Sequence, residues 1–366
     1  MSRPSNWIPG VKKIAVLRAN ALGDYIFVQP ALQALRSAYP QAEIVYLGKP
    51  WHAAYLAGRP GPVDRVIQVP RYKGVSEPDT WTGPDVGEQA ALERFFAEMQ
   101  AEQFDLALQI HGGGGNSNPF VLRLGARITA GMRAPTAPAL DRWMPYVYWQ
   151  HEVLRQIEVV GLVGAPPVAL EPHIVVTERD RAESCAVVPE MEQPLVVLHP
   201  GASDPRRRWP AENYASTGDA LARAGCAVAV VGIPEEQAVV KAVVGTMQAP
   251  VLNLCGRLSL HGLTGLISRA ALVVANDSGP RHLAEAVGTP TVGIFWCGNL
   301  INAGPAFRSL HRPHLSWRLT CRVCGKNTLH EPCTHQESFV DEVKVEEVVE
   351  SALDLLRLSG RLSADA

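Results

Sequence analysis

The sequence predicts an α/β protein of two domains, each built on a parallel sheet that is covered by helices. Short apolar runs alternate with helix-length amphipathic segments, which is the pattern of stacked β-α-β units. Of the 366 residues, 47% are hydrophobic and only 19% are charged, as expected for sheets buried on both faces. The chain is also too long for one ordinary core, so two domains are expected.

The first half of the chain contains five predicted strands, at 12–18, 42–47, 65–69, 104–110 and 127–131. Predicted helices cover 24–39, 88–102 and 148–162. The stretch 71–86, rich in Gly, Pro and charge, is predicted to be a loop, and the Gly-rich stretch 111–118 is expected to be too flexible for regular structure. We therefore expect a first domain over residues 1–165, followed by a linker region over 166–190.

The second half repeats the pattern, with predicted strands at 194–199, 226–232, 251–254, 272–276 and 291–296. Predicted helices cover 210–224, 234–247, 260–270 and 279–287. We expect a second domain over 191–342, which includes a Cys/His-rich segment at 311–335, and a C-terminal helix within 343–366. Sheets of this kind bind ligands at the carboxyl ends of their strands. The active site is therefore expected in a cleft across which the two domains face each other.

Composition excludes several classes of protein. A formal charge of -2 gives no general attraction to nucleic acid or anionic lipid, so no nucleic-acid partner is expected. No run of about 18 apolar residues is present, and the start of the chain lacks the apolar core of a signal peptide, which predicts a cytoplasmic protein. The seven cysteines are an odd number and four stand singly in apolar stretches, which indicates reduced thiols.

An acidic residue follows the first predicted strand, in Leu17-Arg-Ala-Asn-Ala-Leu-Gly-Asp24. Gly23 permits a tight turn, and Asp24 stands where it can either cap the next helix or face the expected cleft. The stretch lacks the Gly-x-Gly-x-x-Gly fingerprint of dinucleotide-binding folds, which disfavours a nicotinamide enzyme. Both roles of Asp24 stay open on the residues alone.

Three consecutive arginines follow the predicted strand 194–199, in His199-Pro-Gly-Ala-Ser-Asp-Pro-Arg-Arg-Arg-Trp-Pro210. Guanidinium groups match phosphate oxygens, and the start of the next helix adds partial positive charge. A solvated basic turn is the alternative, but it does not explain why the arginines lie between a strand end and a helix start. The pattern favours diphosphate binding.

A second strand-to-helix turn with polar residues lies in Val273-Val-Ala-Asn-Asp-Ser-Gly-Pro-Arg-His-Leu-Ala284. The backbone N–H groups of Ser278 and Gly279 begin a helix and so form a candidate anion site. Asp277, at the strand end, can accept hydrogen bonds from sugar hydroxyls. His282 is more often a packed residue than a catalyst at such a position.

A third turn of this type contains Glu235 and Glu236. A carboxylate here could bind the two hydroxyls of a ribose, as acidic residues do in nucleotide-binding folds. Negative charge is also favourable in the first turn of any helix, so the sequence does not decide between the two roles.

A cysteine-rich segment contains Cys321-x2-Cys324, then His330, Cys333 and His335. The two-residue spacing fits a turn that aims both thiols at one metal, and Cys333 and His335 would complete four ligands. We interpret Cys321, Cys324, Cys333 and His335 as a candidate structural site for Zn or Fe. A reduced, metal-free flap is the alternative. Basic residues already offer charge compensation at the expected phosphate site, so no cofactor is expected for catalysis.

Together these segments resemble glycosyltransferase family 9, the ADP-heptose:lipopolysaccharide heptosyltransferases. The resemblance is spread from residue 14 to about 296, in the family's order. The matching stretches are Ile14 to Asp24 with Pro30 to Arg36, Asn118-Pro-Phe120 with Leu124-Gly-Ala-Arg127, His199-Pro-Gly-Ala202 with Arg207-Arg-Trp-Pro210, Gly256-Arg-Leu-Ser-Leu260, and Ala275-Asn-Asp-Ser-Gly279 with His282-Leu-Ala284.

The resemblance implies a GT-B fold, in which two Rossmann-like domains bind the acceptor (N-terminal) and the nucleotide sugar (C-terminal). It implies transfer with inversion and without an obligatory metal. By position, Asp24 matches the general base, and Arg207 stands where the family has a phosphate-binding lysine, with Arg208 beside it. The remaining matches are Asp277 for the donor sugar, Ser278 and Gly279 for the phosphates, Leu258 for adenine and Glu235 or Glu236 for ribose. Arg281 replaces a usual apolar residue and could touch phosphate or acceptor.

The implied partners are a nucleotide sugar, with ADP-heptose as the family expectation, and a lipopolysaccharide-core or related glycan acceptor. A lipid-linked acceptor would bring the protein to the cytoplasmic face of the inner membrane as a peripheral protein. The cysteine cluster occurs in only part of the family. Two other functions stay open: a nucleotide-sugar epimerase of the same fold, and a non-catalytic protein that binds nucleotide or glycan.

Overall fold

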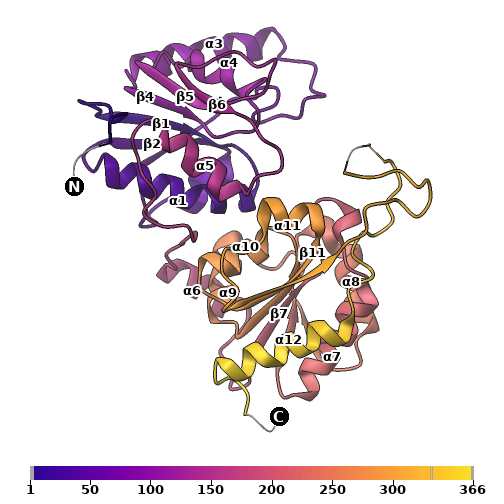
Figure 1. The fold of residues 1–366 in the computed structure, drawn as a ribbon. Coiled ribbons are helices and arrows are strands. Elements are labelled where there is room, and N and C mark those ends of the chain that lie inside the picture. Colours follow the sequence, from indigo (N-terminus) through magenta and orange to yellow (C-terminus); the bar gives the residue numbers. More distant parts are fainter. Residues whose placement is uncertain (1–3, 330, 332, 364–366) are drawn as a thin grey trace. The chain divides into compact units, whose positions relative to one another are not determined.

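The computed structural model of the chain describes residues 4–329, 331 and 333–363. It divides into two compact units, Met1–Val175 and Val176–Ala366. Each unit contains a six-stranded sheet with helices on both faces (Figure 1). All strand pairs in both sheets are parallel. The predicted α/β class with two parallel-sheet domains is therefore confirmed.

The first sheet has the strand order β3-β2-β1-β4-β5-β6. Its strands are β1 (Lys13–Leu17), β2 (Glu43–Gly48), β3 (Arg65–Gln68), β4 (Leu106–Gln109), β5 (Ile128–Arg133) and β6 (Arg142–Pro145). The helices of this unit are α1 (Leu22–Ala38), α2 (Pro50–Leu56), α3 (Val86–Ala101), α4 (Ser117–Leu122) and α5 (Glu152–Gly161).

The second sheet has the strand order β12-β11-β10-β7-β8-β9. Its strands are β7 (Leu195–His199), β8 (Ala227–Val230), β9 (Val251–Asn253), β10 (Leu272–Asn276), β11 (Thr291–Trp296) and β12 (His311–Ser316). Its helices are α6 (Glu178–Val187), α7 (Ala211–Arg223), α8 (Gln237–Thr246), α9 (Leu260–Arg269), α10 (Gly279–Ala286), α11 (Cys297–Ala303) and α12 (Val345–Leu358), with short 3₁₀ turns η1 (Pro205–Arg207) and η2 (Pro234–Glu236).

Both sheets follow the same doubly wound plan. Numbered within its own unit, each sheet has the order 3-2-1-4-5-6, so the direction in which successive strands are added reverses between the first and fourth strands. In open α/β sheets, ligands bind beyond the carboxyl ends of the strands at this reversal. The plan therefore points to the ends of β1 and β4 in the first unit, and of β7 and β10 in the second.

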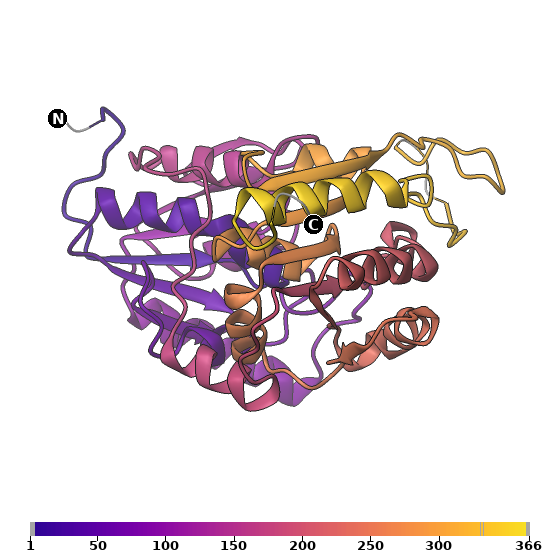
Figure 2. The ribbon, with the colours of Figure 1, turned by 90° about the horizontal axis from the view of Figure 1, so that it is seen from below.

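Apolar helix faces close each sheet. In the first unit, Phe96 of α3 and Phe120 of α4 pack on the side chains of β1 and β4 that point to that face. In the second unit, Tyr214 of α7, Val243 of α8 and Leu355 of α12 form one core layer. Figure 2 shows α12, in yellow, lying along the orange strands of the second sheet. These layers fix the strands whose ends carry the candidate site.

Of the four edge strands, β3 and β9 coincide with the predicted strands 65–69 and 251–254, but β6, β12 and several short helices were not predicted from the sequence. The edge strand β6 (Arg142–Pro145) and the edge strand β12 (His311–Ser316) carry Pro, Arg and His, because an edge strand pairs on one side only and does not require an apolar run. The prediction that 111–118 has no regular structure is wrong at its end, since α4 begins at Ser117. The range 166–190, expected to be a linker, contains α6.

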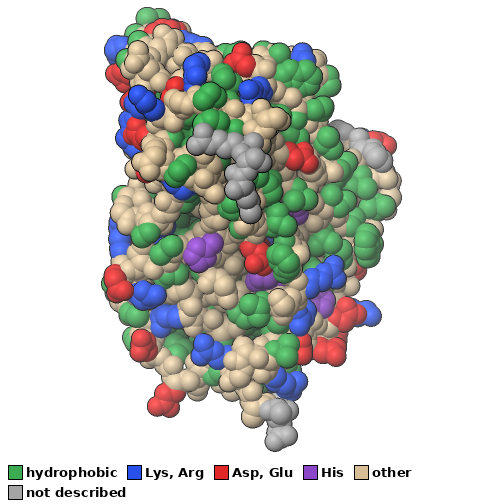
Figure 3. Space-filling view, turned by 60° about the vertical axis from the view of Figure 1, so that its left-hand side comes forward, with side chains coloured by type: hydrophobic (Ala, Val, Ile, Leu, Met, Phe, Trp, Pro, Cys, Tyr) green, Lys and Arg blue, Asp and Glu red, His purple; other side chains and the backbone are tan. Residues whose placement is uncertain are grey.

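The described residues contain no helix with the length and apolar character required to cross a membrane. On the face shown in Figure 3, basic and acidic side chains are interspersed. This agrees with the formal charge of -2.

Helices α6 and α9 approach each other closely in the second unit. A Cβ added at Gly265 would lie 2.0 Å from the backbone oxygen of Asp180 and 2.8 Å from the Cβ of Ser184. We therefore expect Gly265→Ala to lower the free energy of unfolding by about 1–3 kcal/mol, since the backbones must separate to admit the methyl group. Urea denaturation followed by circular dichroism measures this change.

Gly245 in α8 provides the matched control, because a Cβ there meets nothing within 4 Å. Gly245→Ala should leave the free energy of unfolding unchanged or raise it by up to about 1 kcal/mol through helix propensity. Equal unfolding midpoints for the wild type and Gly265→Ala would contradict the close approach of the two helices.

Candidate active site

Asp24 lies at the start of α1, directly beyond the end of β1. The helix begins at Leu22 after the N-cap residue Ala21, so Asp24 is the third helical residue and not the cap. Its Oδ2 accepts the backbone N–H of Ala21 at 3.0 Å, and its Oδ1 accepts a bond from Nη2 of Arg18 at 2.5 Å. The side chain is 32% exposed. Asp24 thus has a structural role at the helix start and still presents a carboxylate to solvent.

Arg18, a buried residue at the end of β1, orients this carboxylate through its hydrogen bond. Its side chain is only 5% exposed, and it donates to the Ile110 carbonyl at 2.5 Å and to Glu152 at 3.3 Å. Burial alone would lower the pKa of Arg18, but the negative charges of Asp24 and Glu152 raise it above its usual value. The guanidinium therefore stays positive and holds Asp24 in one orientation.

Glu152 connects this pair to the loop before α5. It also forms an ion pair with Arg155, which is buried. Nη2 of Arg155 donates to the carbonyl oxygens of Val147, Tyr148 and Gln150, at 2.7–3.0 Å. The chain Asp24, Arg18, Glu152, Arg155 fixes the loop 146–151 relative to Asp24. None of the last three residues was assigned a role from the sequence.

The residues that follow β4 lie beside those that follow β1, at the carboxyl end of the first sheet. His111 is buried and its Nδ1 accepts the backbone N–H of Ala19 at 3.2 Å. Burial lowers the pKa of His111 to about 3, so its ring is neutral at physiological pH. The Gly-rich loop that follows is held by Gln109, whose Nε2 donates to the carbonyls of His111 and Gly112 and to Ser117. The loop is therefore tied to the sheet, in contrast to the flexibility predicted for it.

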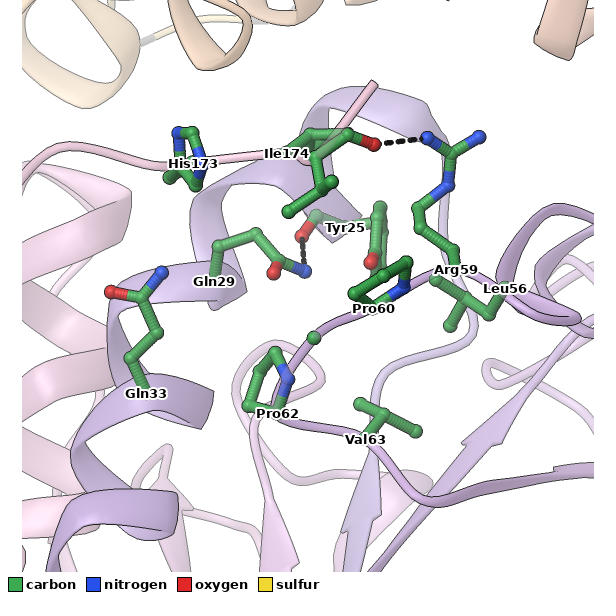
Figure 4. A pocket seen from close by; sticks show the side chains of 12 residues that line it. Tyr25, Gln29, Gln33, Leu56, Arg59, Pro60, Pro62, Val63, His173 and Ile174 are labelled. Carbon is green, nitrogen blue, oxygen red and sulfur yellow. Dashed lines mark hydrogen bonds between the residues drawn. The ribbon is translucent and has the colours of Figure 1, made fainter. Parts of the chain in front are cut away.

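A pocket in the first unit lies beside α1 but does not include Asp24. It is lined by Tyr25 and Gln29 of α1, by the loop 59–63 and by the segment 173–175 (Figure 4). Arg59 donates to the carbonyl of Val175 at 2.6 Å and lies over the ring of Tyr55. This pocket contains none of the predicted site residues.

In the second unit, the arginine turn after β7 meets the turn after β10. Nη1 of Arg207 donates to Oδ2 of Asp277 at 3.0 Å, and its Nη2 donates to Ser203 at 2.7 Å. Burial opposes ionisation of Asp277, but the hydrogen bond from His282 and the charges of Arg281 and Arg207 outweigh it, so the pKa of Asp277 lies below its usual value. The structure thus brings two predicted residues from distant motifs into contact.

Asn276, at the end of β10, locks these two turns together. Its Oδ1 accepts the backbone N–H of Trp209 at 3.0 Å, and its Nδ2 donates to the carbonyls of Pro200 and Gly201. Arg208 turns back within the first turn, where its Nε and Nη2 donate to the carbonyl of Ala202. Sequence reasoning assigned no role to Asn276, although the residue ends a predicted strand.

His199 links the helix start at Ser278 to Glu236. Its Nδ1 lies 3.0 Å from Oγ of Ser278, and its Nε2 lies 3.2 Å from Oε2 of Glu236. Burial raises the pKa of Glu236, but the hydrogen bond and charge of His199 and the N–H of Ile233 bring it below the usual value. A Cβ at Gly201 would lie 1.9 Å from Glu236 Oε1, so the glycine is what admits this carboxylate. His199 is therefore a further candidate site residue, which lies in the arginine motif but was assigned no function from the sequence.

Gly279 begins α10, and Ser278 is its N-cap. The first N–H groups of a helix lack intrahelical acceptors. These amides follow Asp277, which Arg207 contacts, so they lie at the same sheet edge as Arg207. Glu235 is exposed, whereas Leu258 is half-buried in the loop before α9. That loop lies against the turn that carries Glu236, because a Cβ at Gly256 would contact Pro234 at 3.3 Å.

Arg281 does not reach the surface, contrary to the suggestion that it touches phosphate or acceptor. Its side chain is 1% exposed, lies over the ring of Phe295, and donates to Glu285 at 2.6 Å and to the Ala303 carbonyl at 2.8 Å. His282 is also buried, and its Nε2 lies 3.1 Å from Oδ1 of Asp277. Both residues are buried and contact Oδ1 of Asp277, so they hold its carboxylate in place.

The cysteine cluster assembles as the spacing predicted. One ligand atom from each of Cys321, Cys324, Cys333 and His335 lies within 4.8 Å of the others. The Sγ atoms of Cys324 and Cys333 are 3.6 Å apart, and Sγ of Cys333 is 3.4 Å from Nδ1 of His335. Tetrahedral Zn–S and Zn–N bonds imply separations of about 3.8 and about 3.6 Å. The donor set therefore fits one tetrahedral metal ion. His330 lies outside the described residues.

Comparison with known proteins identifies relatives of the chain. The model of glycosyltransferase family 9 (heptosyltransferase) matches residues 92–332. Lipopolysaccharide heptosyltransferase 2 of Salmonella typhimurium is 26% identical over 300 residues, which cover 77% of this chain and 82% of the relative.

Solved structures show the same fold. The glycosyl transferase family 9 structure from Veillonella parvula DSM 2008 has a TM-score of 0.77 at 22% identity, and covers 97% of this chain and 100% of its own. E. coli ADP-heptose LPS heptosyltransferase II has a TM-score of 0.72 at 21% identity, with coverage of 95% and 99%. TibC from enterotoxigenic E. coli H10407, described as an iron-containing dodecameric glycosyltransferase, has a TM-score of 0.55 at 12% identity and covers 96% of this chain and 78% of its own.

Proposed function

The chain belongs to glycosyltransferase family 9 and is a glycosyltransferase of the GT-B fold class, and on this premise we propose that it transfers heptose from ADP-heptose to a lipopolysaccharide-core or related glycan acceptor. The observation that carries the proposal is the convergence of Arg207, Asp277, Ser278 and Gly279 at the strand reversal of the second sheet. The names of the relatives support heptose as the sugar and lipopolysaccharide as the acceptor.

We propose that the second unit holds the donor. Arg207 offers a planar fork of donors to the diphosphate, and the amides of Ser278 and Gly279 add the partial positive charge of a helix start. Arg208 stands beside this turn as a further positive charge. Asp277 would accept bonds from the sugar, with Leu258 against the base and Glu235 or Glu236 at the ribose. Because Glu236 is engaged by His199, it would bind ribose through its remaining lone pairs.

The acceptor hydroxyl would be activated by Asp24 of the first unit. The carboxylate takes the hydroxyl proton while the oxygen attacks the anomeric carbon from the side opposite the diphosphate, which inverts that carbon. Arg18 keeps the carboxylate pointing in one direction, and charge that develops on the leaving diphosphate is stabilised by Arg207 and the helix-start amides. This mechanism requires the two edges to face each other in the reacting complex.

The cysteine cluster has a structural role in this proposal. Three thiolates and one imidazole suit zinc or iron, and a bound ion would cross-link the segment 321–335. The iron-containing description of TibC makes iron one of the two metals to test. That catalysis needs no cofactor stays a prediction, as does a cytoplasmic location at the inner face of the membrane.

Mass spectrometry of a transfer reaction tests the function. The chain is incubated with ADP-heptose and a lipopolysaccharide acceptor that lacks the heptose, with UDP- and GDP-sugars in parallel. We expect one heptose to be added to the acceptor and ADP to be released, only when both substrates are present. Conversion of ADP-heptose to an isomer without acceptor would instead identify an epimerase. Donor binding without any turnover would identify a binding protein.

A further inference from the structure

Residues 333–339, which begin at two of the four candidate metal ligands, contact the arginine turn (residues 204–208) directly. Nη1 of Arg206 donates to the carbonyl of Cys333 at 3.2 Å, and the backbone N–H of Phe339 donates to the carbonyl of Arg206 at 2.7 Å. Oγ of Ser338 donates to the carbonyl of Arg208 at 2.7 Å. The guanidinium of Arg206 also lies over the ring of Phe339, 5.3 Å from its centroid. The backbone on both sides of Arg207 is therefore held by residues 333–339.

The described residues from 321 to 335, which carry the four ligands, bury few apolar side chains that could keep them in one conformation. Residues 322–326 are exposed, and among the described residues from 321 to 335 only Cys321 is fully buried. Figures 1 and 2 both show this segment extending away from the second sheet. Short segments without a core of their own usually need a covalent or metal cross-link to adopt one conformation.

The cysteine pair already has the local geometry of a metal-binding turn. Gly325 follows Cys324 with φ at +70°, a conformation that glycine adopts without strain, and its N–H donates to the carbonyl of Cys321 at 2.9 Å. The N–H of Cys321 in turn donates to the carbonyl of Lys326 at 3.0 Å. This turn aims two thiols to one side, where Cys333 and His335 meet them.

We propose that metal bound by Cys321, Cys324, Cys333 and His335 sets the conformation of the arginine turn and thereby the affinity for the donor diphosphate. This inference rests on the proposed role of Arg207 as a diphosphate ligand. The ligands Cys333 and His335 fix the start of the segment 333–339, and that segment fixes the carbonyls of Arg206 and Arg208. Without the ion, Cys333 loses its anchor, and the bond from Arg206 to its carbonyl is weakened. The arginine turn must then be ordered in part by the nucleotide itself, which costs binding free energy.

Calorimetric titration with ADP tests the proposal on the full chain. Elemental analysis of the purified protein should give one zinc or iron per chain. After the metal is removed with a chelator that is then dialysed away, we expect the Kd for ADP to rise by about 10-fold or more, and to return to its first value when Zn²⁺ or Fe²⁺ is restored. Circular dichroism in parallel shows whether the second unit stays folded.

Arg206→Ala separates the contact from the metal site itself. This variant keeps all four ligands and the backbone contacts of Ser338 and Phe339, but it loses the bond to the Cys333 carbonyl and the ion pair with Asp204. We therefore expect weaker ADP binding and a smaller response to metal removal than in the wild type. Cys324→Ser should behave as the metal-free wild type. If Cys324→Ser does not fold, Arg206→Ala still provides the test.

The outcomes distinguish this proposal from the proposed function. A folded metal-free protein with the ADP affinity of the metal-loaded protein would overturn the link between metal and donor site, as would a purified protein that holds no metal and binds none when it is supplied. If even the metal-loaded protein failed to bind ADP, the proposed donor site would be wrong instead.

Discussion

Asp24→Asn is expected to lower kcat for sugar transfer by about 10²–10⁴-fold, which is the usual contribution of a general base. The amide cannot take the acceptor proton, and its single oxygen can accept from either the Ala21 N–H or Arg18, whereas the carboxylate accepts from both. Arg18 keeps Glu152 as its ion-pair partner and Ile110 as an acceptor. The fold should therefore persist, and the affinity for ADP, which depends on the second unit, should be unchanged. Initial rates by mass spectrometry and calorimetric titration with ADP give the two quantities.

Asp105→Asn provides a matched control for this loss. Asp105 also accepts backbone N–H groups, those of Lys12 and Lys13, but it does so at the amino end of β1, away from the strand ends that carry the candidate site. We expect this variant to transfer sugar at the wild-type rate. Wild-type turnover by Asp24→Asn would show that another group removes the proton.

Arg207→Ala is expected to weaken donor binding by about 10- to 100-fold, which corresponds to the loss of hydrogen bonds to a charged group. Asp277 remains supported by His282 and Arg281, so the turn after β10 should keep its structure. The Kd of Arg207→Lys for ADP should lie between those of the wild type and Arg207→Ala, because lysine keeps the charge but lacks the planar guanidinium group. Calorimetric titration with ADP measures all three proteins.

The control for the arginine is Arg223→Ala. Arg223 is an exposed arginine near the carboxyl end of α7, where its Nε donates to the Asp219 carbonyl. Its removal should leave the Kd for ADP unchanged. A Kd for Arg207→Ala equal to that of Arg223→Ala would remove Arg207 from the donor site.

The central strands and their helices could be predicted because burial on both faces imposes an apolar run. The predicted strands at 12–18 and 272–276, for example, coincide closely with β1 (Lys13–Leu17) and β10 (Leu272–Asn276). Each of these strands ends in a short polar turn before a helix, so Asp24 and Asp277 could be predicted as candidate site residues from their position and chemistry. The edge strand β12 (His311–Ser316) could not, since its outer side makes no ladder and tolerates Pro and His.

Side-chain contacts between residues that are distant in the sequence were also not predicted. Arg18 is separated from Glu152 by more than a hundred positions, and His199 from Ser278 by 79. Nothing local in the sequence indicates that such side chains will meet, because the contact depends on which strands are neighbours in the sheet. For the same reason Arg281 was expected to be able to touch phosphate or acceptor, although its side chain is buried.

A crystal structure of the chain with a donor analogue and an acceptor would show where both substrates bind relative to Asp24 and Arg207. We expect the acceptor hydroxyl oxygen to lie within hydrogen-bond distance of the Asp24 carboxylate, about 2.6–3.2 Å, and the diphosphate to contact Arg207 and the amides at the start of α10. A complex in which the bound sugar is remote from Asp24, or in which the diphosphate occupies another part of the second unit, would contradict the proposed mechanism.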